Sequence, residues 1–190
     1  MKCNPAIEPH LHRADCPCGS MALSRRSALR LGLGAAAVGS ALLSARGAIA
    51  KDEGNYEAML LYCIDPRFVT NTAAYMDGSH LKNQYSQFVF AGGPIGAVAP
   101  KFASWHQTFW DNLDVSVQLH RIKKVIALSH RDCGAAAIAY GEAAVATADA
   151  ETSTHIKALQ QFRAQCSQKH PKLAVVTGIM ALDGNVLVVG

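Results

Sequence analysis

The sequence predicts a three-layer α/β domain with a mostly parallel central sheet flanked by helices and a C-terminal antiparallel edge strand. Apolar runs of strand length alternate with longer segments whose apolar residues recur every three or four positions, which is typical of a sheet covered by helices. Residues 58–64 are continuously apolar, as in a strand buried on both faces. Near the C-terminus, Asp183-Gly184-Asn185 separates two apolar runs, which indicates an antiparallel hairpin.

The first strand is expected at residues 58–64 and ends before Pro66, which cannot donate to a strand ladder. A helix is expected at 68–76, where Asp77-Gly78-Ser79 breaks it. A second strand at 87–91 is followed by a glycine-rich turn at 92–96. That turn has two interpretations: an ordinary strand–helix connection, or a loop whose backbone approaches a functional site closely.

The longest helix is expected at residues 101–121. Its apolar residues recur at intervals of three and four and share one face: Phe102, Trp105, Phe109, Leu113 and Val117. We therefore expect Trp105 and Trp110 to pack in the core rather than to contact a substrate. The next strand, at 125–128, leads directly to His130.

The remaining segments continue the alternation of helices and strands. Residues 134–148 are mostly alanine, a strong helix former. A helix starting just after Cys133 would point its positive N-terminal end at the residues gathered at the strand ends, where it would favour thiolate over thiol. Capping residues at 151–154 predict another helix, with Cys166 on its core-facing side. Strands at 173–180 and 186–189 end the chain.

The positive charge is concentrated at the N-terminus. The chain has 190 residues and a formal charge of +4; of its 18 Lys and Arg and 14 Asp and Glu, six and two fall in residues 1–50, which leaves twelve of each sign in the remainder. The body of the protein is therefore neutral, and the sequence offers no basic footprint for nucleic acid.

Residues 1–50 are predicted to be a twin-arginine export signal, followed by a single domain at 51–190. Arg25-Arg26 precedes an apolar stretch at 31–45, and Ala48-Ile49-Ala50 supplies a small-x-small cleavage site. The stretch is too short and too rich in Gly and Ala for a spanning helix, so a cleaved signal is favoured over an uncleaved anchor. This predicts a periplasmic or secreted bacterial protein that meets the membrane only during export, with Met1 or Met21 as the start.

Two motifs place metal-binding side chains at strand ends. Cys63-x-Asp65-x-Arg67 follows the first strand, and His130-x-x-Cys133 follows the third. Parallel strands end at a common edge, where ligands bind, so Cys63, His130 and Cys133 are expected to hold Zn²⁺ there with a fourth position for water or for Asp65. The odd number of cysteines after residue 50 argues against a disulfide framework, although a disulfide between Cys63 and Cys133 remains the main alternative.

The paired motifs resemble the signature of the β-class carbonic anhydrases. The resemblance runs from about Tyr56 to the C-terminus and implies that family's fold, with zinc-dependent, reversible hydration of carbon dioxide to bicarbonate by a zinc-bound hydroxide. It implies catalytic roles for Asp65 and Arg67: in one form Asp65 pairs with Arg67 and accepts a hydrogen bond from the hydroxide, and in another it binds the metal and closes the site. A homodimer or higher homo-oligomer is also implied.

The chain departs from the family's pattern in two places. Residues 90–93 read Phe-Ala-Gly-Gly, where the family usually has Arg-Asn-Ala-Gly, and the N-terminal helices that typically wrap a partner subunit are missing. Two alternative functions stay open on the same site. One is hydrolysis of COS or CS2, which are linear molecules similar to carbon dioxide, and the other is a non-catalytic zinc-binding or redox-active dithiol protein.

Overall fold

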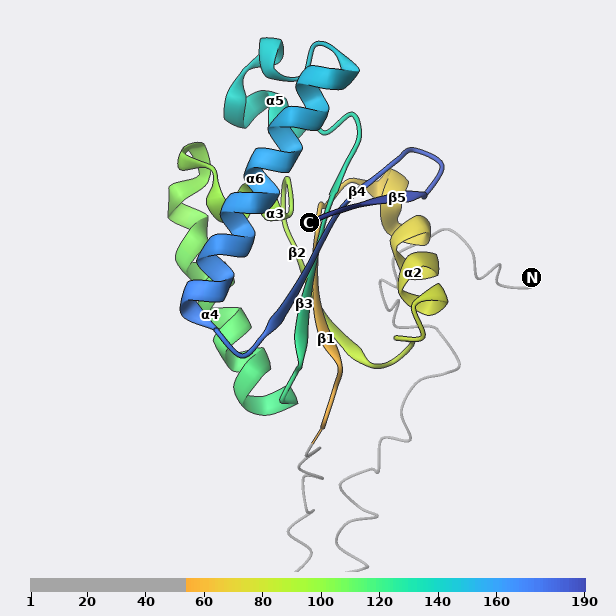
Figure 1. Cartoon of the computed structure of the whole chain (residues 1–190), viewed down its shortest axis with the longest axis vertical. Coiled ribbons are helices and arrows are strands. Elements are labelled where there is room, and N and C mark those ends of the chain that lie inside the picture. The colour runs from red at the N-terminus through yellow and green to blue at the C-terminus, as the bar shows by residue number, and fades with distance from the viewer. Residues whose placement is uncertain (1–53) are drawn as a thin grey trace, which may run out of the picture. The chain divides into compact units, whose positions relative to one another are not determined.

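The central sheet is five-stranded and mostly parallel, as the sequence predicts. A computed structural model describes residues 54–190 (Figure 1), so the predicted export signal lies outside the described residues. The strands lie in the order β2-β1-β3-β4-β5, and only the last pair is antiparallel. Their bounds are Ala58–Tyr62 for β1, Tyr85–Val89 for β2, Lys124–His130 for β3, Ala174–Met180 for β4 and Val186–Val189 for β5.

Helices cover both faces of the sheet and make the outer layers. Helix α2 lies on one face, and α3, α4 and α6 lie on the other (Figure 1). The helices span Val69–Gly78 (α2), Pro94–Val98 (α3), Ala103–His120 (α4), Gly134–Tyr140 (α5) and Ala148–Lys169 (α6), with one-turn 3-10 helices at Pro66–Phe68, Pro100–Phe102 and Glu142–Ala144. None of the described helices is both long and apolar enough to span a membrane.

The continuous apolar runs of β1 and β3 are explained by burial on both faces. Leu60 and Ile126 pack with Phe68 in the cluster beneath α2. The alternate residues of the same strands, such as Leu61, pack with Phe109 beneath α4 and α6. Because side chains alternate along a strand, a central strand with helices on both sides must be apolar at every position.

Three helix predictions need correction. The longest helix is α6 with 22 residues, not α4 with 18. The alanine-rich helix ends at Tyr140 rather than near residue 148, because Gly141 adopts a φ of +89° and turns the chain out of the helix. Helix α6 begins before Glu151, because the side chain of Thr147 caps it by accepting a hydrogen bond from the N–H of Ala150.

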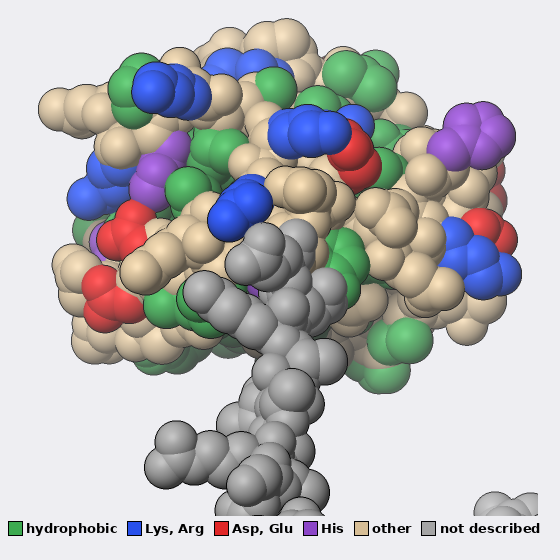
Figure 2. Space-filling view, turned by 90° about the horizontal axis from the view of Figure 1, so that it is seen from below, with side chains coloured by type: hydrophobic (Ala, Val, Ile, Leu, Met, Phe, Trp, Pro, Cys, Tyr) green, Lys and Arg blue, Asp and Glu red, His purple; other side chains and the backbone are tan. Residues whose placement is uncertain are grey.

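The strand order creates a switch point between β1 and β3. From β1 the chain goes to β2 on one side of it, and from β2 it crosses to β3 on the other side. Connections that leave in opposite directions open a crevice at the carboxyl ends of the two strands, where α/β proteins bind ligands. The opposite, amino-terminal edge, seen from below in Figure 2, shows Lys and Arg side chains interspersed with acidic and hydrophobic ones.

Candidate metal centre

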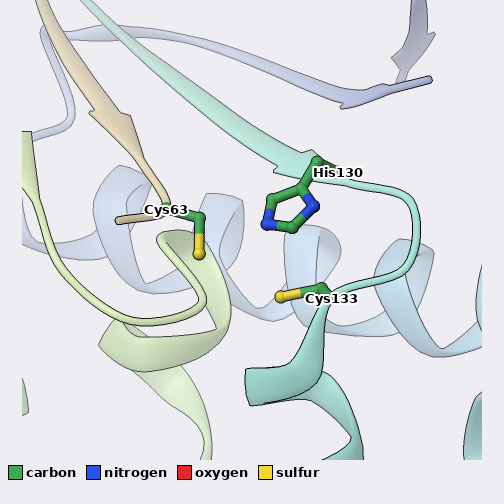
Figure 3. A group of neighbouring side chains, drawn as sticks. All are labelled: Cys63, His130 and Cys133. Carbon is green, nitrogen blue, oxygen red and sulfur yellow. The ribbon is translucent and has the colours of Figure 1, made fainter. Parts of the chain in front are cut away.

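Cys63, His130 and Cys133 meet at this switch point. Cys63 follows the end of β1, His130 is the last residue of β3, and Cys133 immediately precedes α5. All three are buried, and their ligand atoms lie within 4.8 Å of one another. The side chains point toward a common centre (Figure 3). Residues that are seventy positions apart in the chain thus form one group that could hold a metal ion.

The imidazole of His130 is oriented as a metal ligand would be. Its Nδ1 lies 2.8 Å from the carbonyl oxygen of Arg131, so Nδ1 carries the proton of that hydrogen bond. Its Nε2 is buried and has no hydrogen-bond partner among residues 54–190. The ring also packs against Phe68, with 4.3 Å between the ring centroids. A backbone carbonyl that fixes the ring and leaves one nitrogen available is the usual support of a ligating histidine.

The two thiols are free and electrostatically unequal. The structure holds Cys63 and Cys133 as free cysteines rather than as a disulfide. The Cys133 thiol, His130 and the N–H of Gly92 all lower the pKa of Cys63. The neighbouring Cys63 sulfur and burial raise the pKa of Cys133. Burial alone would lower the pKa of His130, but the Cys63 sulfur and the Arg131 carbonyl raise it. The thiolate is the form of cysteine that binds a metal, so a bound cation would displace the proton from the Cys133 thiol.

The glycine-rich turn lies against this group, which decides between its two interpretations. The N–H of Gly92 donates a hydrogen bond to the Cys63 sulfur over 3.2 Å. Gly92 and Gly93 have φ values of +77° and +51°, and a Cβ on Gly93 would lie 2.9 Å from the carbonyl carbon of Tyr62. Only glycine allows the backbone to come this close in these conformations.

Asp65 lies beside the group but is held by Arg67. The Arg67 guanidinium donates from Nη2 to one oxygen of Asp65 over 2.7 Å and from Nε to the other over 3.0 Å. The Arg67 backbone N–H adds a further hydrogen bond of 3.0 Å. These interactions lower the pKa of Asp65 to about 2. The structure therefore has Asp65 paired with Arg67, outside the three-residue group.

Sequence reasoning missed Asp132 and Glu151. The Arg67 guanidinium also donates from Nη1 to the Asp132 carboxylate over 2.6 Å and from Nη2 to the Asp132 carbonyl over 2.9 Å. Glu151 accepts a hydrogen bond from the Asp132 N–H over 2.6 Å. The position of Asp132 between two metal-binding residues could have indicated its role in the site. The role of Glu151 could not be predicted in this way, because a hydrogen bond to a backbone N–H leaves no pattern in the sequence.

The Trp prediction holds for one residue of two. Trp110 is buried and stacks on Phe162, as expected. Trp105 is 38% exposed and lines an apolar hollow of about 440 Å³ together with Ile64, Phe90 and other residues. Ile64 is the chain neighbour of Cys63, but Cys63, His130 and Cys133 do not line this hollow.

No family model matches the chain. It is 31% identical to an uncharacterised protein of Rickettsia conorii over 126 residues, which cover 66% of this chain and 68% of that protein. It is 32% identical to an uncharacterised protein of Rickettsia bellii over 126 residues, which cover 66% and 77% of the two chains. This chain belongs to their family. Both relatives are uncharacterised, so they assign no activity to this chain.

Solved structures with a similar arrangement include two β-carbonic anhydrases. That of Aspergillus fumigatus, CafA, is 15% identical, with 72% of this chain and 76% of that chain covered and a TM-score of 0.49. That of Coccomyxa, in complex with acetazolamide, is 15% identical, with 71% and 72% covered and a TM-score of 0.48.

Proposed function

We propose that the chain is a zinc enzyme that reversibly hydrates carbon dioxide to bicarbonate, as the β-class carbonic anhydrases do. The observation that carries this proposal is the meeting of two thiols and an imidazole nitrogen that has no hydrogen-bond partner within residues 54–190, beside a carboxylate held by arginine. Each part has a distinct chemical task, and together they make a site for a metal-assisted attack on a small electrophile.

The three donors suit zinc. Thiolate and imidazole ligands are preferred by Zn²⁺. The buried Nε2 of His130 has no hydrogen-bond partner in the described part of the chain, and a metal ion would satisfy it. Three protein ligands leave one position for water, as in catalytic rather than structural zinc sites. A zinc ion held there supplies a Lewis acid that lowers the pKa of water bound to it.

Asp65 is suited to orient the attacking water. Since its pKa is about 2, the carboxylate is ionised at every physiological pH and acts only as a hydrogen-bond acceptor. Arg67 occupies both of its oxygens and so keeps the carboxylate from turning onto the metal. We expect Asp65 to accept a hydrogen bond from the water. That hydrogen bond would orient the water so that a lone pair of the water oxygen points at the substrate carbon.

The surroundings of the site favour a small apolar substrate. Ile64, the chain neighbour of Cys63, is 61% exposed, and with Phe90 and Trp105 it lines the apolar hollow. Carbon dioxide fits this description, and so do COS and CS2. The apolar Phe90-Ala91 pair in place of Arg-Asn therefore makes hydrolysis of these sulfur compounds the second candidate. The same exposed apolar surface suits the homodimer that the family resemblance implies.

The test combines metal counting with kinetics. Zinc in the purified full chain is measured by elemental analysis, and carbon dioxide hydration is followed by stopped flow at pH 7 and pH 8.5. We expect Cys133→Ser to lose about one equivalent of zinc relative to the wild type and to lose hydration. Wild-type hydration should be faster at pH 8.5, because two electron-donating thiolates make the zinc a weaker acid than three histidines would.

The other outcomes separate the candidates. Equal zinc in both proteins would show that the Cys63–His130–Cys133 group binds no zinc and would overturn the proposal. Zinc at the site without carbon dioxide hydration, but with hydrolysis of COS or CS2, would establish the second candidate. Zinc at the site with neither activity would indicate a non-catalytic metal-binding protein.

A further inference from the structure

The two-residue segment between the ligands His130 and Cys133 is held in an unusual backbone conformation. Asp132 has a φ of +57°, a left-handed conformation that Asp adopts more readily than most residues but still at a cost in free energy. The N–H of Arg131 is fixed by the carbonyl of Met180 in β4. The conformation of Asp132 therefore sets how His130 and Cys133 face each other.

Glu151, in the first turn of α6, contacts the backbone of Asp132 directly. Its Oε1 accepts the hydrogen bond from the Asp132 N–H over 2.6 Å, and its Oε2 lies 3.1 Å from Nη1 of Arg131. The same Arg131 nitrogen lies 3.3 Å from the carbonyl of Ala148. Glu151 is only 9% exposed. A buried carboxylate that uses both oxygens on one loop fixes that loop firmly.

The influence of this contact extends to Asp65 through Arg67. Besides Asp65, the guanidinium is held by the carboxylate and the carbonyl of Asp132. The Arg67 and Asp132 side chains are exposed, at 47% and 72%, and exposed ion pairs alone position side chains weakly. The contact that fixes this network is therefore the buried hydrogen bond between the Asp132 N–H and the Glu151 carboxylate.

Helix capping does not explain Glu151. The first turn of α6 is already capped by Thr147, and a carboxylate is costly to bury unless its partners require it. Among its hydrogen bonds and ion pairs, two join it to the segment between the two ligands. The burial of Glu151 is therefore explained by its contacts with the segment between His130 and Cys133 and not by a role in starting α6.

We propose that Glu151 is a positioning residue of the metal centre, which acts by holding Asp132 in its left-handed conformation. It sets the spacing of His130 and Cys133 and, through Asp132 and Arg67, the orientation of Asp65. This inference rests on the proposed function, because it takes the three-residue group to bind a metal ion.

Two conservative variants of the full chain separate the effect of the length of the Glu151 side chain from the effect of its negative charge. Glu151→Asp keeps the charge but is one methylene shorter, so its carboxylate cannot reach the Asp132 N–H from the same helix position. Glu151→Gln loses the charge but keeps an oxygen at the right distance. Ser153→Ala, an exposed position on the same turn, is the matched control, and circular dichroism checks that each variant is folded.

The readouts are Co²⁺ affinity, by competition with a chelator, and the thiolate-to-cobalt and d–d absorption bands. Loss of a residue that orients metal ligands typically weakens metal binding about 10- to 100-fold. We expect a loss of at least about tenfold with altered bands for Glu151→Asp, and less than about threefold with unaltered bands for Glu151→Gln. Ser153→Ala should match the wild type in both.

The outcomes distinguish this inference from the proposed function. Wild-type affinity and bands in Glu151→Asp, or a greater loss in Glu151→Gln than in Glu151→Asp, would overturn the positioning role even in an active enzyme. A wild type that binds cobalt with the expected variant order but does not hydrate carbon dioxide would overturn the function and leave the positioning role standing. A wild type that binds no cobalt at Cys63 and Cys133 would overturn both the positioning role and the proposed function.

Discussion

At the scale of single residues, the chemistry of the site depends on which groups share the Arg67 guanidinium. Asp65 and Asp132 both bind it, although one lies at the end of β1 and the other follows β3. The guanidinium therefore joins the two motifs across the crevice as well as fixing the carboxylate. An arginine with planar, fixed donors can make these contacts at the same time, and a lysine cannot.

Replacement of Asp65 by Asn should separate catalysis from metal binding. We expect Asp65→Asn to reduce carbon dioxide hydration at least about 100-fold, as removal of a positioned acceptor does, with unchanged zinc content because Asp65 lies outside the ligand group. Stopped-flow kinetics and elemental analysis measure the two quantities. Asp77→Asn, at an exposed position in α2, is the control. Turnover that survives in Asp65→Asn would show that the carboxylate has no part in the reaction.

Gly93 should tolerate no side chain. Gly93→Ala would place a Cβ 2.9 Å from the Tyr62 carbonyl carbon at a φ of +51°, so we expect a loss of stability of about 2 kcal/mol or more. Gly78→Ala is the control, because its Cβ meets nothing within 4 Å, and should be neutral or stabilising by up to about 1 kcal/mol. Thermal unfolding compares the two. Equal melting temperatures would contradict the close approach of the turn to β1.

At the scale of elements, α6 contributes both to the core and to the site. Leu159, Phe162 and Cys166 lie fully buried on one face, as their spacing predicts. One turn after Glu151, His155 is also fully buried, and neither of its ring nitrogens is hydrogen-bonded within the described part of the chain. Burial lowers the pKa of His155 to about 4, so the ring is neutral in the folded protein near neutral pH.

This histidine should make the folded protein sensitive to acid. Between pH 6.5 and 4 the unfolded chain protonates His155 and the folded chain does not, so stability present above pH 6.5 is lost as the pH falls, by an amount on the order of 3 kcal/mol. We expect His155→Leu to flatten this part of the pH profile. Urea unfolding of chelator-treated protein at pH 7, 5.5 and 4.5 measures it.

The control for this prediction is a histidine in solvent. His80→Asn changes an exposed residue with a φ of +59°, which Asn tolerates, and should keep the wild-type profile. If His155→Leu and the wild type lost stability in parallel below pH 6.5, the acid sensitivity would have another source.

The elements were predictable where local chemistry sets them. Strands β1 to β5 lie within three residues of their expected bounds, because apolar runs next to Pro or Gly leave few alternatives. Cys63, His130 and Cys133 were predictable as a group because parallel strands end together. The end of α5 was not, because alanine content does not reveal the backbone angle of Gly141. Nor was the contact of Glu151, whose partner is a backbone N–H on another element.

At the scale of the whole molecule, a bound metal ion would add a further link between segments that the sheet and the Arg67 guanidinium already connect. Its ligands would be Cys63 just after β1, His130 at the end of β3 and Cys133 just before α5. Zinc at 100 times its dissociation constant should add about 2.7 kcal/mol to the stability, which for a domain of this size corresponds to roughly 10 °C in melting temperature. We therefore expect chelation to lower the melting temperature by about that amount and zinc, but not magnesium, to restore it.

Cys133→Ser provides the reference for that measurement. It should melt near the temperature of the chelated wild type and respond little to added zinc. A wild type whose melting temperature is the same with and without the chelator would contradict binding of the ion to the folded state.

The parallel pairing of β1 with β3 also has a consequence for how the chain folds. Ala58 of β1 is opposite Lys124 of β3, so this pairing closes a long loop, and such contacts form late. During synthesis on the ribosome, Cys63 emerges seventy residues ahead of Cys133. Its thiol therefore has no metal-binding partners until the His130-x-x-Cys133 motif has also been synthesised. We therefore expect the yield of metal-competent protein to depend on the redox conditions during synthesis. In refolding, helical dichroism would recover before the cobalt–thiolate absorbance appears.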